Sequence, residues 1–82
     1  MEVEQRVRQY IVDNLRFYGP PDTLTSDYRL IDNDVLDSMA IFEVISFLED
    51  NFGIVVEDND LVPENFESLK AIANLVTEKA GG

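Results

Sequence analysis

Apolar residues recur at helical spacing in three segments of this chain, at about residues 3–17, 37–52 and 67–78. Side chains three or four positions apart share one face of an α-helix, so each segment can bury a stripe against the others. The only run with β character, residues 54–56, is three residues long and has no partner strand. The pattern predicts an all-α fold: a small bundle of three main helices plus one short helix at residues 58–62.

Residues that begin and end helices stand at the borders of these segments. Residues 18–21, YGPP, are predicted to end the first helix, because proline cannot continue the hydrogen-bond ladder and glycine readily adopts the terminating conformation. Asp37 is suited to cap the second helix, and Gly53 is suited to end it. Ser68 is the candidate cap of the last helix, and residues 80–82 are expected to fray. The inward stripes are predicted to be Val3, Val7, Tyr10, Ile11 and Phe17, then Ile41, Val44, Ile45, Leu48 and Phe52, then Leu69, Ile72, Ala73 and Val76.

The connection at residues 22–36 is long but not polar. Large apolar and aromatic side chains recur through it, at Leu24, Tyr28, Leu30, Ile31, Val35 and Leu36. Burial of such side chains is favourable, so we expect them to pin the segment across the helices. The sequence therefore predicts a long ordered loop between the first two helices rather than a flexible linker.

The size and composition of the chain set its class. It has 82 residues with an apolar fraction of 45%, which suits a single domain over residues 1–82. It contains no cysteine, which excludes disulfides and zinc–thiolate sites, and no histidine, the commonest general base. The first residues lack the pattern of a signal peptide, and no apolar stretch is long enough to cross a bilayer. We therefore expect a cytoplasmic monomer that binds no membrane.

The net charge of -11 falls on one contiguous region. Between Leu30 and Leu69 there are eleven acidic residues and no lysine or arginine, whereas six acids balance six bases in the rest. A field of this sign repels nucleic acid and attracts basic protein surfaces. The predicted partners are therefore basic proteins, with no nucleic acid among them.

Ser38 lies within the acidic region, at the predicted start of the second helix. An Asp–Ser pair at a helix start is ordinarily explained by capping alone. The first helical position, however, is also where free backbone N–H groups and the helix dipole favour an attached phosphate. Ser38 is therefore the candidate modification site. The outward face of the same helix, a candidate docking face for a protein partner, is predicted to contain Met39, Phe42, Glu43, Ser46 and Asp50.

Residues 30–39, LIDNDVLDSM, resemble the attachment site of acyl and peptidyl carrier proteins. The resemblance continues at Ile41, Val44, Ile45, Leu48, Phe52, Gly53 and Ile54, and in residues 63–69, PENFESL. These stretches follow the order of the family, so the chain is similar to a carrier domain over nearly its whole length.

The resemblance implies that a phosphopantetheinyl transferase moves 4′-phosphopantetheine from coenzyme A onto the hydroxyl of Ser38. Asp37 would cap the helix and present the serine. The thiol of the arm would then carry an acyl or aminoacyl group as a thioester between an activating ligase and a downstream synthase or transferase, and the chain itself would not be an enzyme. Met39, Ala40 and Phe42 differ from the residues usual in the fatty-acid type. Residues 37–39, DSM, and residues 63–69, PENFESL, look more like those of a discrete carrier of amino acids or specialised acyl groups.

Metal binding by the acidic residues is not predicted. An EF-hand calcium loop starting at Asp32 would need an oxygen ligand at Leu36 and a glycine at Asp37. A loop starting at Asp58 would need a carboxylate at Leu69. Neither requirement is met.

Two further alternatives to a carrier are an enzyme and a non-covalent adaptor. Catalysis by Ser38 would need an adjacent base, and the chain has no histidine. An acidic adaptor that binds a basic partner is compatible with the charge. Such an adaptor needs no hydroxyl at a helix start, so Ser38 favours the carrier.

Overall fold

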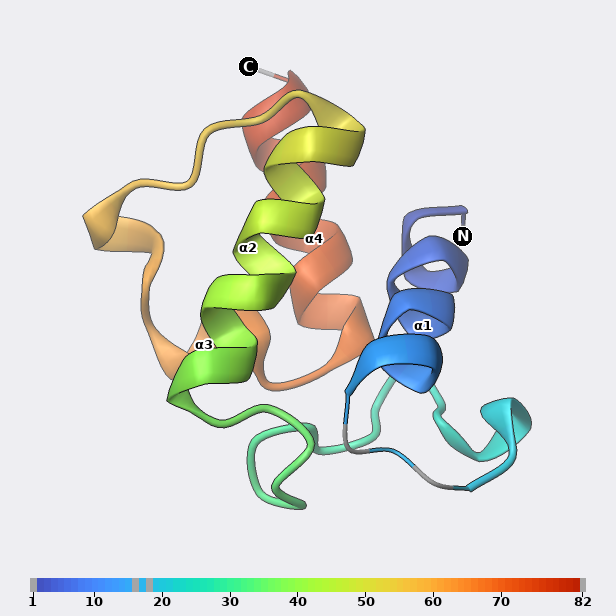
Figure 1. Ribbon diagram of the computed structural model, residues 1–82. Helices are drawn as coiled ribbons and strands as arrows, with labels where there is room; N and C mark the ends of the chain where they lie inside the picture. The colour runs from blue at the N-terminus through green and yellow to red at the C-terminus, as the bar shows by residue number, and fades with distance from the viewer. Residues whose placement is uncertain (1, 16, 18, 82) are drawn as a thin grey trace.

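The computed structural model describes residues 2–15, 17 and 19–81. They form four α-helices, α1 (Glu2–Asn14), α2 (Ser38–Phe52), α3 (Pro63–Phe66) and α4 (Leu69–Gly81), with 3-10 turns at Pro21–Thr23 and Asp58–Asp60 (Figure 1). The described part of the chain contains no strand, and the all-α prediction is confirmed. None of the helices in this part combines the length and the apolar character that crossing a membrane requires.

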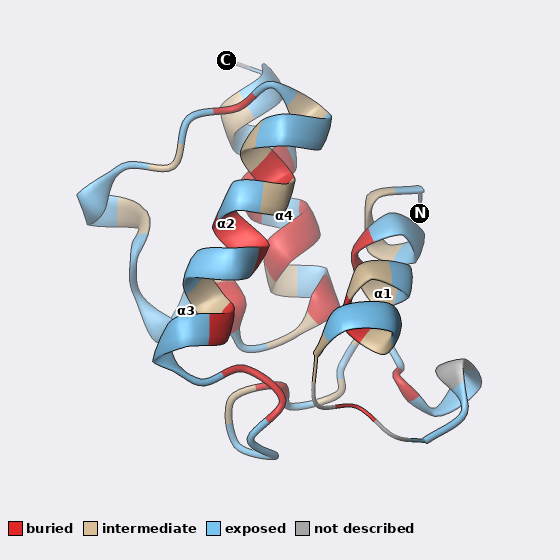
Figure 2. Cartoon of the chain, in the orientation of Figure 1, coloured by how far each residue is buried: buried red, intermediate tan, exposed pale blue. Residues whose placement is uncertain are grey.

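The core lies around α4, which packs against α1, α2 and α3. In Figure 2 the buried residues lie on the inner sides of the helices, and the exposed residues face outward. The side chains most completely buried are Val7, Ile11, Leu24, Leu30, Leu36, Val44, Leu48, Phe66, Leu69 and Ile72. Removal of these apolar groups from water is the main favourable contribution to folding.

The predicted stripes need correction in α2. Ile41, predicted at the centre of the buried face, is only half-buried, while Ala40 on the neighbouring side is buried. The buried arc of α2 therefore consists of Ala40, Val44, Ile45 and Leu48. Phe52, at the end of α2, is half-buried as well. In the other helices Val3 and Tyr10 are half-buried rather than buried, and Leu75 joins the buried residues of α4.

Two helix ends differ from the prediction. The first helix ends at Asn14 rather than Phe17. Phe17 lies outside the helix and packs its ring edge-on against Tyr28, with 5.6 Å between the ring centroids. The last helix continues to Gly81, so residues 80 and 81 are helical rather than frayed. Gly82, and Tyr18 in the predicted stop signal, lie outside the described residues.

The short helix predicted at residues 58–62 is present as a shorter 3-10 turn, and the sequence did not predict the helix that follows it. The structure has a 3-10 turn at Asp58–Asp60 and a separate helix, α3, that begins at Pro63. Proline suits the first helical position because its missing N–H would have had no intrahelical partner there. Phe66, at the other end of α3, is 1% exposed and fixes this short helix to the core.

The loop between α1 and α2 is ordered, as the sequence predicts. The backbone N–H of Leu30 donates to the carbonyl of Glu67 at 2.9 Å, and the N–H of Lys70 donates to the carbonyl of Ser26 at 3.1 Å. These two bonds join the loop to the start of α4. Its buried apolar side chains are Leu24, Leu30, Val35 and Leu36.

An ion pair joins the end of α4 to the loop between α2 and α3. The Nζ atom of Lys79 lies 2.6 Å from Oδ2 of Asp60 and 3.5 Å from Oε1 of Glu57. The bond from Lys79, reinforced by one from the Glu57 N–H, lowers the pKa of Asp60 below its usual value. The same bond to Asp60 raises the pKa of Lys79.

Lys79→Gln is expected to lower the Tm by a small amount near neutral pH and to have no effect in strong acid. The pKa of Asp60 is lower in the folded protein than its ordinary value of 3.8. The stability that this difference provides is therefore fully present above pH 3.8 and is lost as the pH falls through the pKa of the folded state. The pKa of Lys79 is higher in the folded protein than its ordinary value of 10.5. The stability that this difference provides is present below pH 10.5 and is lost as the pH rises through the pKa of the folded state. Melting curves across pH test this, with Lys70→Gln as the charge-matched control. An equal loss at pH 2 would contradict the assignment.

Candidate functional site

The start of α2 is built by an N-cap at Asp37. This residue is extended, with φ -99° and ψ -173°, and its Oδ1 atom accepts a hydrogen bond from the Ala40 N–H at 2.8 Å. Its backbone carbonyl accepts the N–H of Ile41 at 2.9 Å. The predicted cap is therefore present, and Ser38, the first residue of the helix, is exposed.

A compact turn leads into this helix start. The N–H groups of Val35 and Leu36 both donate to the carbonyl of Leu30, at 2.9 and 3.0 Å, and both side chains are buried. Asp34 closes the turn with φ 61°, in the left-handed region that aspartate tolerates better than most residues. The turn and its buried anchors fix the direction from which the chain reaches Ser38.

The other three serines of the chain occupy different environments. The Ser26 hydroxyl donates to the Glu4 carboxylate, and the Ser68 oxygen accepts the Ala71 N–H at 3.1 Å as the predicted cap of α4. Ser46 is exposed, but it lies in the middle of α2. Ser38 is thus the serine that combines exposure with a position at a helix N-terminus.

The predicted docking face is on the outside of α2. Met39 and Phe42 are 75% and 59% exposed, which is high for such large apolar side chains. The polar members Glu43, Ser46 and Asp50 are exposed along the same helix. Exposed apolar side chains surrounded by acids form the kind of surface that protein partners use.

Sequence reasoning did not find an apolar groove that borders Ser38. The groove has a volume of about 480 Å³ and lies between the first turns of α2 and the segment that leads into α3. Ile41 and Phe42 line it on one side, and Leu61, Val62 and Phe66 line it on the other. Its opening explains why Ile41 is only half-buried. The sequence feature that could have indicated this groove is the apolar pair at residues 61–62, directly before Pro63.

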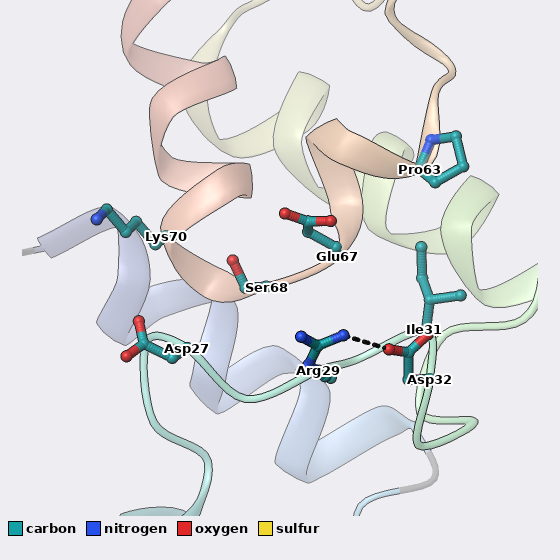
Figure 3. Close-up of a pocket in the computed structure, with 8 residues that line it drawn as sticks. All are labelled: Asp27, Arg29, Ile31, Asp32, Pro63, Glu67, Ser68 and Lys70. Carbon is teal, nitrogen blue, oxygen red and sulfur yellow. Dashed lines mark hydrogen bonds and ion pairs between the residues drawn. The ribbon is translucent and has the colours of Figure 1, made fainter.

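A second hollow, of about 330 Å³, is lined mainly by charged residues (Figure 3). Arg29 Nη1 lies 2.8 Å from Oδ2 of Asp32, and this hydrogen bond raises the pKa of Arg29. Ile31 and Pro63 line both this hollow and the groove, so the two are neighbours. Ser38 does not line this hollow, and its arginine is already paired with an aspartate.

Calcium binding in the manner of an EF-hand does not fit the backbone. The helix that starts at Ser38 divides the stretch between Asp32 and Glu43 that would have to form one loop. Within residues 2–15, 17 and 19–81, no three acidic side chains are grouped so that they could hold a metal ion.

Comparison with known proteins identifies carrier proteins over the full length of the chain, although no family model matches. The acyl carrier protein of Campylobacter hominis is 32% identical over 77 residues, which cover 94% of this chain and 89% of the relative. That of Akkermansia muciniphila is 34% identical over 82 residues, covering 98% and 94%. Among solved structures, the holo acyl carrier protein of Nitrosomonas europaea matches 100% of both chains with 34% identity and a TM-score of 0.83. The apo structure of KstB-PCP matches 89% of this chain and 80% of its own, with 34% identity and a TM-score of 0.74.

Proposed function

Because this chain belongs to the acyl carrier protein family, we propose that Ser38 is the residue that bears its 4′-phosphopantetheine group. The chain is a carrier protein, and the carrier relatives favour this covalent function over a non-covalent adaptor. When bound, the group supplies a terminal thiol on which an acyl or aminoacyl cargo is held as a thioester.

The observation that carries the proposal is the exposed Ser38 at the first position of α2, directly after the Asp37 cap. Backbone N–H groups of a first helical turn lack intrahelical acceptors, and the positive end of the helix dipole lies at the same place. A phosphodiester on the Ser38 oxygen is an anion, so it suits this position. The residues present therefore fit the group.

The mass of the intact protein after incubation with coenzyme A and a promiscuous phosphopantetheinyl transferase tests the proposal. We expect a gain of one phosphopantetheinyl group, which peptide mapping assigns to the peptide that contains Ser38. No gain by a demonstrably folded protein, or a gain confined to another serine, would contradict the assignment.

Acyl carrier proteins work with synthesis enzymes, and the partners of this chain are proposed to be of three kinds. They are the transferase, an acyl- or aminoacyl-activating ligase, and a downstream synthase or transferase. The likeness of residues 37–39 and 63–69 to discrete carriers supports an amino acid or a specialised acyl group as the cargo. As a carrier the chain would have no catalytic activity of its own, and its proposed location is the cytoplasm.

The outward face of α2 is proposed as the surface that these enzymes contact. Met39 and Phe42 supply apolar area, and the acids around them attract a basic partner and speed its encounter.

Glu43→Lys is expected to slow modification by the transferase several-fold at low salt and much less at high salt. The reason is that exposed charges separated by more than a Debye length are screened at high ionic strength. Initial rates at two salt concentrations measure the effect, and Glu78→Lys on α4 is the matched control. Equal rates for the two variants at low salt would place the docking face elsewhere.

A further inference from the structure

The segment between α2 and α3 supplies one wall of the apolar groove described above. We call residues 55–62 of this segment the strap. Its last two residues, Leu61 and Val62, line the groove opposite α2. No residue of the strap is buried. Figure 2 shows the strap standing out from the helices, with exposed residues along most of its length. Burial of its own side chains therefore does not hold this wall in place.

The end of the strap is organised around Asp60. Its Oδ2 atom accepts the Glu57 N–H at 2.9 Å, and its carbonyl accepts the Val62 N–H at 2.9 Å. The same carbonyl accepts a hydrogen bond from Nδ2 of Asn65, on α3, at 2.9 Å. These bonds fix the shape of the turn that carries Leu61 and Val62. The position of Asp60 therefore sets the position of the wall.

A base on α4 binds this carboxylate. Lys79 Nζ lies 2.6 Å from Oδ2 of Asp60, the atom that also accepts the Glu57 N–H. Only 24% of the Lys79 side chain and 18% of the Asp60 side chain are exposed, so salt screens this pair less than an exposed pair. Within the described part of the chain, no other lysine or arginine is within ion-pair distance of the strap. The strap is also tied to α2, by a 3.0 Å bond from the Val56 N–H to Oε2 of Glu49, but this bond lies at the opposite end of the strap from the groove.

We propose that Lys79 holds the strap closed, and that the groove beside Ser38 opens when the ion pair with Asp60 breaks. With the pair intact, Leu61 and Val62 stand opposite α2 and narrow the groove. Without it, the three acids of the strap repel one another and lose the cation that draws them toward α4. The strap then moves away from α2, and more of the apolar surface next to Ser38 meets solvent. This goes beyond the proposed function, because it concerns the unmodified chain and holds whether or not Ser38 bears a group.

The absence of cysteine from the chain allows one introduced thiol to report on the groove. Ile41→Cys places a thiol on the α2 side of the groove, where the residue is half-buried. We expect Lys79→Gln to raise its rate of alkylation by iodoacetamide, an uncharged reagent, about threefold near neutral pH, the size expected for one partly exposed ion pair. Val12→Cys is the matched control, because Val12 is half-buried on α1 and does not line the groove. Its rate is expected to be the same with and without Lys79→Gln.

Asp60→Asn tests whether the effect comes from the ion pair itself. It should raise the rate at Ile41→Cys as Lys79→Gln does, and the two substitutions together should raise it no further, because both remove the same contact. Lys70→Gln, which removes a charge from the first turn of α4, should have no effect. An unchanged rate at Ile41→Cys, an equal rise at Val12→Cys, or additive effects of the two substitutions would overturn the proposal.

Methyl NMR of the full chain is a second measurement, and it needs no introduced thiol. The methyl signals of Ile41 are expected to shift in Lys79→Gln, because the strap opposite them has moved, while those of Ile11 in the core stay in place. Ile41 signals that do not shift would show that the strap stays closed without Lys79, and would reject its role.

Discussion

Ser38→Ala is expected to abolish the gain of mass from coenzyme A and the transferase while leaving the Tm almost unchanged. The hydroxyl is exposed, and the bond that caps α2 is donated by the Ala40 N–H to the Asp37 carboxylate, so the substitution leaves the cap in place. Exposed substitutions of this kind change stability by about 0.5 kcal/mol or less. Intact mass and a thermal melt on the same sample measure both quantities.

Ser46→Ala is the matched control, because Ser46 is an exposed serine on the same helix. Although Ser46 lies on the proposed docking face, its hydroxyl is not the proposed acceptor, so the final mass should show complete modification. Residual modification of Ser38→Ala would show that a second hydroxyl is used. A large loss of stability in Ser38→Ala would show that the hydroxyl is structural.

Leu48→Ala is expected to lower the free energy of unfolding by about 2–5 kcal/mol. Leu48 has no exposed surface and lies in the buried arc of α2, so truncation removes apolar contacts and leaves a cavity. Domains of this size are stable by about 5–15 kcal/mol at most, so the variant loses a large fraction of its stability. Urea unfolding followed by circular dichroism measures the change.

Two other truncations on α2 calibrate this result. Met39→Ala should be nearly neutral, because the side chain is mostly exposed. Ile41→Ala should cost less than Leu48→Ala, because Ile41 is half-buried beside an open groove. If Ile41→Ala cost as much as Leu48→Ala, the buried face would be centred on Ile41, as the helical wheel alone predicts.

The limits of α2 could be predicted because the signals that set them are local. An aspartate before the first turn can accept a backbone N–H, and the structure has this bond at Asp37. A glycine can adopt a positive φ, and Gly53 does so at 66°, where its N–H donates to the Glu49 carbonyl. The candidate attachment serine follows from the same signals, since it is defined by its place after the cap.

Features that depend on tertiary contacts could not be predicted in this way. Phe17 has the spacing to continue α1, but its contact with Tyr28 takes it out of the helix. A helix as short as α3 is not stable by itself, and it forms because Phe66 is buried in the core. The groove beside Ser38 joins residues from distant parts of the chain, so periodicity within one segment carries no information about it.

The two backbone bonds between the long loop and the start of α4 have a consequence for the order in which the protein folds. They join residues roughly forty positions apart, so their formation requires closure of a long segment. During synthesis the loop and α1 emerge before the helix against which they pack. The Leu30 N–H, at the start of the turn that leads into Ser38, therefore meets its acceptor only after Glu67 has been made. A transferase that required this bond in order to modify Ser38 would act only on chains synthesised beyond residue 67.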